Sequence, residues 1–251
     1  MIVLFLYQES MSDNKLKQLQ EVLGVTFSNT ALLQEALTHS SYVNENSPAT
    51  ANERLEFVGD AVLGLILAEK LFLDYPDLAE GDLTRMRSQL VCRSSLATIA
   101  RTIGLGDYLY LGQGEATSGG RGKPANLAGA LEALFAAIYL DRDWQSTREC
   151  VMHIFKDDLA RISRERHSDD YKSHLQEALQ HLFKAAPSYH IIAESGPDHN
   201  RQFTAEVVLD DKVLACGVGR SKKLAEADAA RTALEALRET APSSTLPPLL
   251  S

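Results

Sequence analysis

One stretch of the chain combines a strongly apolar helical pattern with three carboxylates that such a helix carries at a cost. The stretch is Asn52–Gly64, which reads NERLEFVGDAVLG. At about 100° per residue, Glu53, Glu56 and Asp60 fall within an arc of roughly 60° on a helix. Most of the remaining circumference is apolar, which is typical of a helix packed on most sides. The pattern therefore predicts a helix whose acids form a buried cluster rather than a solvated face.

A second apolar segment carries a single charge. Between Lys123 and Asp141 the only charged residue is Glu132. An ionised carboxylate in such surroundings costs several kcal/mol unless it is paired or binds a metal. We expect Glu132 to meet the acids of 52–64, because one cation would compensate them all. Oxygen ligands with no His or Cys nearby favour Mg²⁺, with Mn²⁺ as a substitute. Such a cation suits phosphodiester hydrolysis, since it activates water and neutralises developing charge.

Ion pairing inside the domain is the alternative for these acids. Glu53 could equally pair with an arginine or lie against another subunit. Glu80 precedes a predicted helix and fits either a surface role or a second metal position. His39 is a single histidine and is more typical of a packed or capping residue than of a catalyst. The candidate partners for the acids are Arg54, Arg85 and Arg87.

Composition sets broad limits on the class of protein. The net charge of −9 does not exclude nucleic acid, because binding needs only one basic face. No apolar run is long enough to span a bilayer, so we expect no membrane partner. The first residues lack the pattern of a signal peptide; they form a tail, or the protein starts at Met11. Three distant cysteines without a CxxC pair indicate free thiols and, by default, a cytoplasmic location.

The chain divides into two predicted domains. Apolar residues recur at helical spacing through the first, an all-helical domain over 12–162. Residues 163–170 contain no apolar residue and are the predicted linker. Residues 171–240 then read as helix, three strands and helix, which makes a small α+β domain. The segment 241–251 is rich in Pro and Ser and is expected to be disordered.

The second domain offers three separated contact regions for RNA. Lys222 and Lys223 begin its final helix, where free N–H groups and the helix dipole favour phosphate. By itself this pattern also fits a solvated helix start. Gln176 and Glu177 lie on the exposed face of the first helix, and a tight turn ends at His199. Together the three regions suit recognition of A-form RNA by its shape.

These residues closely resemble the ribonuclease III family. The resemblance covers about residues 15–239 and implies an all-α endonuclease domain followed by an α-β-β-β-α double-stranded-RNA-binding domain. The matching segments of the first domain are Asn52–Gly64, Ala36–His39, Glu80–Asp82, Met86–Arg87 and Glu132–Leu134. Those of the second are Leu175–Glu177, Gly196–His199 and Ser221–Lys223.

The resemblance also implies an activity. It indicates a homodimeric, Mg²⁺-dependent endonuclease that cuts double-stranded RNA to 5′-phosphate and 3′-hydroxyl ends with short 3′ overhangs. Expected substrates are ribosomal precursors, structured mRNA and tRNA. The implied metal ligands are Glu56, Asp60 and Glu132, and the implied catalytic residues are Asp60 and Glu132, with Glu53 and Glu80 nearby. The implied RNA-binding residues are Gln176, Glu177, His199, Ser221, Lys222 and Lys223.

One position departs from the family pattern. The family has an Asp three residues before Glu132 as a further metal ligand, and this chain has Gly129. Glycine supplies no side-chain oxygen and weakens a helix by about 1 kcal/mol relative to Ala. A water could fill the gap at reduced affinity, because Mg²⁺ keeps several water ligands. Two interpretations follow: an active enzyme, which the retained acids favour, or a catalytically weakened RNA-binding regulator, which Gly129 favours.

Overall fold

The computed structural model describes residues 14–197 and 201–240 and divides into two units, residues 1–159 and 160–251. Each unit is a separate body with its own core. The predicted domain start at residue 12, the RNA contact at His199 and the disordered tail at 241–251 lie outside the described residues. In the part that is described, no helix is long and apolar enough to cross a membrane.

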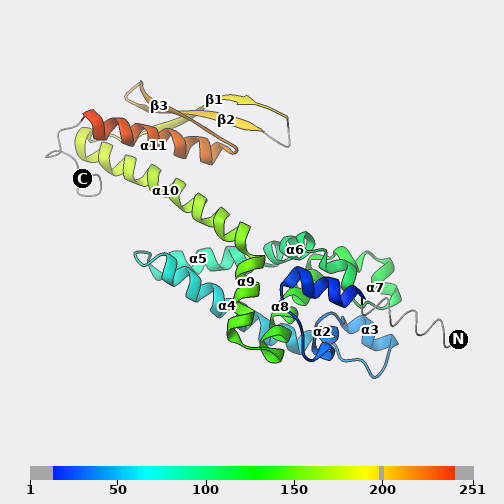
Figure 1. Cartoon of the computed structure of the whole chain (residues 1–251). Helices are drawn as coiled ribbons and strands as arrows, with labels where there is room; N and C mark the ends of the chain where they lie inside the picture. Colours follow the sequence, from blue (N-terminus) through cyan, green and yellow to red (C-terminus); the bar gives the residue numbers. More distant parts are fainter. Residues whose placement is uncertain (1–13, 198–200, 241–251) are drawn as a thin grey trace. The chain divides into compact units, whose positions relative to one another are not determined.

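The first unit is helical, as predicted (Figure 1). One isolated β-bridge joins Thr38 to Tyr110. After a helical segment at 14–23, the elements are α2 (Thr30–Ala36), α3 (Ser40–Glu45), α4 (Glu53–Asp74), α5 (Glu80–Val91), α6 (Arg93–Thr102), the 3-10 helix η1 (Leu105–Tyr108), α7 (Gln113–Thr117), the 3-10 helix η2 (Gly120–Gly122), α8 (Pro124–Asp141) and α9 (Trp144–Ile154).

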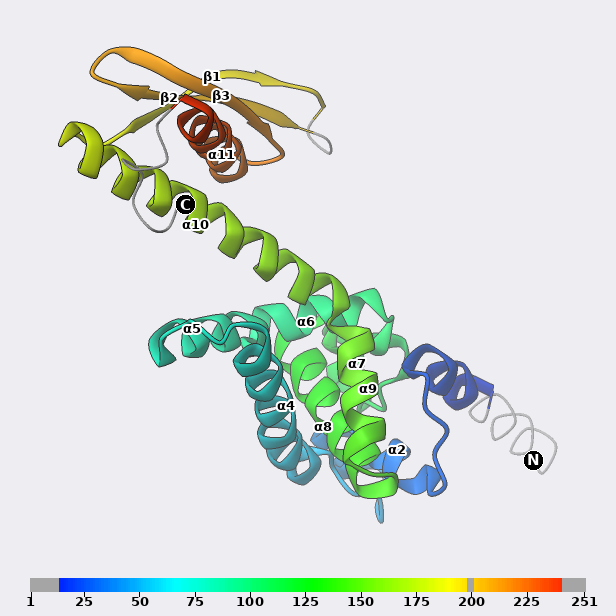
Figure 2. The ribbon, with the colours of Figure 1, turned by 60° about the vertical axis from the view of Figure 1, so that its left-hand side comes forward.

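Helix α8 forms the centre of this unit. All residues from Leu127 to Ile138 are buried except Glu132, which is half-buried. Pro124 stands in the first turn, where a helix tolerates the missing N–H. Helices α2, α4, α6 and α9 pack against α8, and Figure 2 shows α4 running beside it. The nearly uncharged sequence of α8 follows from this position, since apolar neighbours surround the helix on most sides.

Helix α4 corrects one prediction. It contains the acid-bearing stretch, but it is not packed on most sides. Leu63, Ile66 and Leu67 are fully buried, whereas Phe57 is 80% exposed, Leu65 58% and Phe72 66%. The exposed side chains follow one another at about two helical turns and share a face. Helix α4 therefore has one apolar side that faces the core and another that is uncovered. The sequence alone does not distinguish these two sides, because both are hydrophobic.

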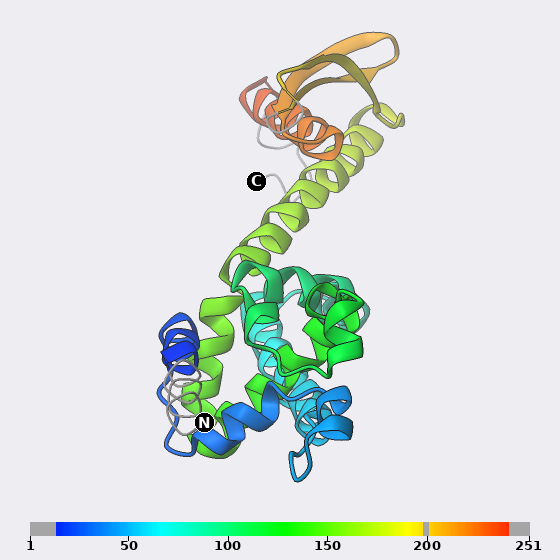
Figure 3. The same ribbon diagram turned by 90° about the vertical axis from the view of Figure 1, so that its right-hand side faces the viewer.

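The second unit has the predicted α-β-β-β-α order. Helix α10 (Lys156–Phe183) is followed by β1 (Ser188–Ser195), β2 (Gln202–Leu209), β3 (Lys212–Gly219) and α11 (Lys222–Thr240). The strands form an antiparallel sheet in the order β1-β2-β3, and α11 packs on one face of it (Figure 3). The core contains Leu175, Leu179, Val207, Ala230 and Leu234.

The predicted linker is helical. Residues 163–170 lie inside α10, so the helix expected from residue 171 begins earlier, at Lys156. The segment contains no Pro or Gly that would break a helix, and its Arg and Glu residues are good helix formers. Because the segment has no apolar residues, it lacks the periodicity by which a packed helix is predicted from sequence. Its residues nevertheless favour a helix. The position of the domain boundary stays a prediction.

Candidate active site

A close approach of two helices brings the acids together. A Cβ atom at Gly59 of α4 would clash with the backbone carbonyl of Glu132 on α8. Only glycine fits such a contact without moving one of the helices. Gly59 stands between Glu56 and Asp60 in the sequence, so the contact places both acids beside Glu132. Of the acids of 52–64, Glu56 and Asp60 thus lie near enough to Glu132 for their charges to act on it, whereas a shared cation stays a prediction.

The acids lie at the rim of the core rather than inside it. Glu56 and Glu132 are half-buried, and Glu53 and Asp60 are exposed. The prediction of a buried cluster is therefore wrong for Glu53 and Asp60. The reason is the uncovered face of α4, which leaves one edge of the helix open to solvent in the chain by itself.

Burial and mutual repulsion raise the pKa of two of these carboxyl groups, those of Glu56 and Glu132. Burial raises the pKa of Glu132 to about 7, and the negative charges of Glu56 and Asp60 add to the effect. Burial also raises the pKa of Glu56, to which the charge of Glu53 contributes. Carboxylates from α4 and α8 thus form one electrostatic unit. Such mutual repulsion is what a shared cation would relieve.

Ion pairing does not explain the acids. Within residues 14–197 and 201–240, none of Glu53, Glu56, Asp60 and Glu132 forms an ion pair with Lys or Arg. Arg85 instead pairs with Asp82 at 3.2 Å. Nor are three His, Cys, Asp or Glu side chains grouped closely enough to hold a metal among the residues described. The acids are neighbours rather than a preformed cage.

Arg93 and His39 influence the site electrostatically. The positive charge of Arg93, the first residue of α6, counteracts the rise in pKa of both Glu56 and Glu132. His39 acts on Glu56 in the same direction. Nothing in the sequence pattern around α6 marks Arg93, so its effect on the site was not predicted. His39 caps α3, and its Nδ1 accepts a hydrogen bond from Ser41 N at 3.1 Å, which confirms its predicted capping role.

Two remaining positions of the predicted site differ in their surroundings. Glu80 begins α5, is exposed, and accepts a hydrogen bond from the hydroxyl of Thr84 at 2.8 Å. Its contact is therefore within its own helix, which agrees with the surface alternative. Gly129 is buried in α8, and the carboxylate of Glu56 lies directly against it.

The RNA-contact candidates of the second unit are solvent-accessible where they are described. Gln176 and Glu177 are exposed on α10. Lys222 and Lys223 are exposed in the first turn of α11, and the hydroxyl of Ser221 accepts a hydrogen bond from Leu224 N at 3.2 Å. Ser221 therefore caps the helix whose N-terminus carries the two lysines. Their contact with RNA stays a prediction.

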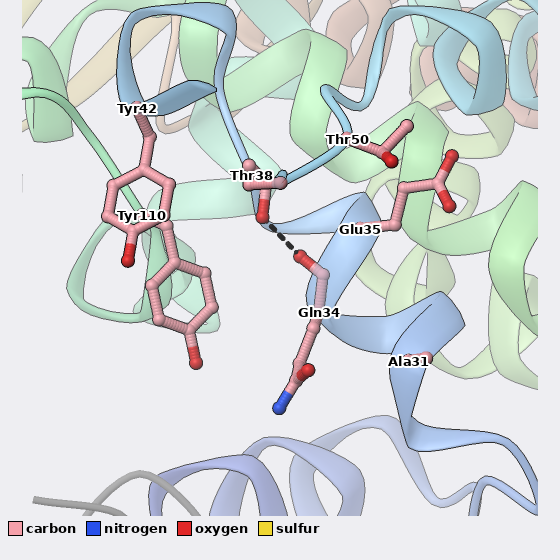
Figure 4. Close-up of a pocket in the computed structure, with 8 residues that line it drawn as sticks. Ala31, Gln34, Glu35, Thr38, Tyr42, Thr50 and Tyr110 are labelled. Carbon is pink, nitrogen blue, oxygen red and sulfur yellow. Dashed lines mark hydrogen bonds between the residues drawn. The ribbon is translucent and has the colours of Figure 1, made fainter. Parts of the chain in front are cut away.

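A cavity of about 410 Å³ lies in the first unit, beside α2 and α3 (Figure 4). Its walls include Gln34, Glu35, Thr38, Tyr42 and Tyr110. The rings of Tyr42 and Tyr110 are 5.6 Å apart, and the hydroxyl of Thr38 donates to the carbonyl of Gln34 at 2.7 Å. None of the predicted site residues lines this cavity. The candidate active site is therefore the set of acidic residues on α4 and α8, and not this cavity.

Comparison with known proteins identifies the family. Residues 29–159 match the model of ribonuclease-III-like domains, and residues 171–237 match the double-stranded RNA binding motif. The chain is 55% identical over 222 residues to Ribonuclease 3 of Dehalococcoides mccartyi, covering 88% of this chain and 94% of that protein. The chain belongs to the ribonuclease III family.

Further members of the ribonuclease III family align over similar lengths. Ribonuclease 3 of Myxococcus xanthus is 44% identical over 243 residues, which is 96% of this chain and 94% of that protein. A solved structure of the ribonuclease III nuclease domain from Campylobacter jejuni is 38% identical and has a TM-score of 0.53, covering 56% of this chain and 95% of that one. The predicted fold class, a helical ribonuclease III domain followed by an α-β-β-β-α double-stranded-RNA-binding domain, is thereby confirmed.

Proposed function

We propose that this member of the ribonuclease III family is an endonuclease that hydrolyses phosphodiester bonds in double-stranded RNA. The observation that carries the proposal is the meeting of Glu132 on α8 with Glu56 and Asp60 on α4, where burial and neighbouring charge raise the pKa of Glu132 to about 7. A group of acids in such a position is typical of a functional site. The double-stranded RNA binding motif over 171–237 supports duplex RNA as the substrate.

The same acids are the proposed Mg²⁺ site, with Mn²⁺ as a substitute. Glu56, Asp60 and Glu132 offer oxygen ligands only, which are the donors that Mg²⁺ prefers. Burial first, and the charges of neighbouring carboxylates second, raise the pKa of Glu56 and of Glu132, and a divalent cation would offset both costs of ionisation. When bound, Mg²⁺ would lower the pKa of a coordinated water and stabilise the charge that develops on the phosphate.

The exposure of each acidic side chain indicates its role in the proposed reaction. Asp60 is exposed at the rim, where a phosphate of the RNA backbone can reach it. Glu132 lies deeper, and its pKa of about 7 leaves its carboxyl group about half protonated at neutral pH. We therefore assign Asp60 and Glu132 as the catalytic pair. Glu53 and Glu80 are proposed to join the site when a second subunit is present.

A homodimer is the proposed assembly. Phe57, Leu65 and Phe72 form an uncovered apolar face on α4, the helix that also carries the acids. Exposed apolar area of this kind is typical of a protein interface. The Campylobacter jejuni structure concerns a region of that nuclease domain involved in dimer formation. Two copies joined through α4 would place two active sites along one RNA duplex.

The expected products are 5′-phosphate and 3′-hydroxyl ends with short 3′ overhangs. Ribosomal precursors, structured mRNA and tRNA are the proposed substrates. Cys92, Cys150 and Cys216 are free thiols, which a reducing compartment maintains, so we propose a cytoplasmic location.

One assay tests the activity. The protein is incubated with a long RNA duplex, and separately with each single strand, in Mg²⁺, in Mn²⁺ and in chelator. We expect the duplex alone to be cut, in either metal and not in chelator, to ends that carry a 5′-phosphate. Duplex binding without cleavage in both metals would contradict the enzyme and favour the RNA-binding regulator that Gly129 suggested.

A further inference from the structure

Side chains from three different elements of the second unit meet at one point. The ammonium group of Lys172 on α10 lies 2.7 Å from a carboxylate oxygen of Glu226 on α11, and 4.5 Å from the centre of the Tyr189 ring on β1. The ion pair is partly buried, with 31% of the Lys172 side chain and 24% of the Glu226 side chain exposed. Solvent therefore screens it less than it screens an ion pair on the open surface.

Tyr189 takes part through its ring. Its hydroxyl oxygen is buried and forms no hydrogen bond with any residue in the described part of the chain. The face of an aromatic ring attracts an ammonium group, so the ring holds Lys172 over β1 while Glu226 holds it against α11. One lysine thus connects both helices of the unit and the first strand.

The ion pair lies one helical turn from two groups of RNA-contact candidates. Gln176 follows Lys172 by four residues on α10, and Lys222 precedes Glu226 by four residues on α11. Residues four apart lie on the same face of a helix, about 6 Å apart along its axis. The two helices are therefore joined beside the positions where each is expected to meet RNA.

The apolar core restrains the two helices less strictly. Figure 1 and Figure 2 show α10 and α11 on the same side of the sheet. The part of α11 in the core consists mainly of small residues, Ala229, Ala230 and Ala233, with Leu234. Burial of apolar area is not directional, and small side chains form shallow ridges. Such a face resists a shift or rotation of α11 less than large interlocking side chains would.

We infer that the ion pair between Lys172 and Glu226 fixes the distance between α10 and α11 and thereby the spacing of their RNA-contact positions, so that both helices meet one duplex together. Lys172 and Glu226 are then positioning residues for RNA. The inference rests on the proposed function, because it concerns the same duplex substrate. A domain that recognises A-form RNA by its shape depends on the spacing of its contacts. The positions concerned are Gln176 and Glu177 on α10, and Lys222 and Lys223 on α11.

Glu226→Gln tests the inference by the sign of its effect. The substitution removes a negative charge one turn from Lys222, so charge alone would tighten the binding of RNA. We expect it instead to weaken binding at least about threefold, because the connection between the helices is lost. Affinity of the full chain for a fluorescent RNA duplex is measured by anisotropy in chelator, where no cleavage is expected. Binding as tight as that of the parent, or tighter, would overturn the inference.

Glu235→Gln is the matched control. Glu235 lies on the same helix and pairs at 2.7 Å with Arg231, four residues earlier, so its ion pair stays within α11. The variant makes the same charge change without releasing α10, and we expect it to bind the duplex no more weakly than the parent does. Equal weakening in both glutamine variants would contradict a role for the connection between the helices.

Variants of Lys172 test whether the two residues act as one pair. Lys172→Met removes the ion pair, whereas Lys172→Arg keeps a cation that can pair with Glu226 and stack on Tyr189. We expect Lys172→Met to bind the duplex weakly and Lys172→Arg to bind it as the parent does. Adding Glu226→Gln to Lys172→Met should cause no further loss. Additive losses, or an arginine variant as weak as the methionine variant, would refute the pairing.

The two proposals fail separately. Thermal unfolding of each variant, measured in parallel, establishes that it is folded at the temperature of the binding assay. If the variants bind in the predicted order but the parent cuts no duplex RNA, the endonuclease is wrong and the role of the ion pair stands. If the parent cuts duplex RNA and Glu226→Gln binds like Glu235→Gln, the role of the ion pair is wrong and the endonuclease stands. A parent that does not bind duplex RNA would overturn both.

Discussion

The backbone carbonyl of Glu132 lies directly against Gly59, with no side chain between α8 and α4 at this point. We predict that Gly59→Ala lowers the free energy of unfolding by about 1–3 kcal/mol, because the added methyl group meets backbone that cannot rotate away. Separation of the helices would also weaken RNA cleavage. Urea unfolding followed by circular dichroism measures the change in stability.

Gly64 provides the control within the same helix. A Cβ at this position would meet nothing within 4 Å. Gly64→Ala is therefore expected to be neutral, or to stabilise the chain by about 0.4–1 kcal/mol through the lower entropy of the unfolded state. Equal losses of stability in both variants would mean that the contact with Glu132 is not what requires glycine at 59.

The metal-free protein should gain stability from Glu132 as the pH falls. The pKa of Glu132 is about 7 in the folded chain, above its ordinary value of 4.5, so the folded state binds this proton more tightly than the unfolded state. The penalty of the ionised carboxylate is full above pH 7 and disappears as the pH approaches 4.5. We expect a contribution of about 1–3 kcal/mol, reduced by the partial exposure of the side chain.

Denaturant unfolding between pH 8 and 5, with chelator present, compares the parent with Glu132→Gln. The variant lacks this titration, so the difference between the two curves isolates it. The variant should be the more stable protein at pH 8 and lose its advantage by pH 5. Parallel curves would show that Glu132 is not held in a protonation-sensitive position.

The exposed ring of Phe57 should be needed for self-association. Phe57 is 80% exposed on the apolar face of α4. We predict that Phe57→Ser weakens the dimer at least tenfold, since a buried aromatic anchor is worth about 2 kcal/mol or more at an interface. Sedimentation velocity over a concentration series measures this. Phe183→Ser, which removes a ring 55% exposed at the end of α10, is the control and should associate like the parent.

A dimer unaffected by Phe57→Ser but disrupted by Phe183→Ser would place the interface away from α4. A parent that stays monomeric at all concentrations would exclude the homodimer altogether.

Lys222 should contribute to duplex RNA binding through charge. It is exposed in the first turn of α11, where the helix dipole favours phosphate. We expect Lys222→Glu to weaken binding and to lower the slope of log K against log salt by about 1. Lys212→Glu makes the same charge change at the far end of β3 and should leave the slope unchanged. Identical slopes for the two variants would remove α11 from the RNA-contact surface.

The sequence predicted which segments form helices and strands better than it predicted what packs against each of them. Helical periodicity and the single charge in the α8 sequence were sufficient to predict that Glu132 lies near acids of α4, because a carboxylate in an apolar helix needs a partner. Periodicity did not reveal that Phe57 is uncovered, since a stripe that faces a core and one that faces a second subunit have the same composition. Arg93 was missed because its electrostatic effect on Glu56 and Glu132 depends on how α6 packs, which is not local in sequence.

Gly129 shows the same limit more sharply. In the sequence, Gly129 appears only as a missing metal ligand, because it can be compared only with the Asp that the family has at this position. In the structure the carboxylate of Glu56, from a different helix, lies against Gly129. Which side chain lies against this position depends on the packing of α4 on α8 and cannot be read from the residues around Gly129.

Cleavage by Glu132→Gln tests the central claim most directly. Glutamine keeps the size of the side chain and removes its charge, so folding and RNA binding should persist. With duplex RNA and Mg²⁺ we predict that the variant binds the duplex as the parent does and cuts it at least about 10² times more slowly. A variant that cuts duplex RNA at the rate of the parent would contradict the assignment of the active site to the acids of α4 and α8.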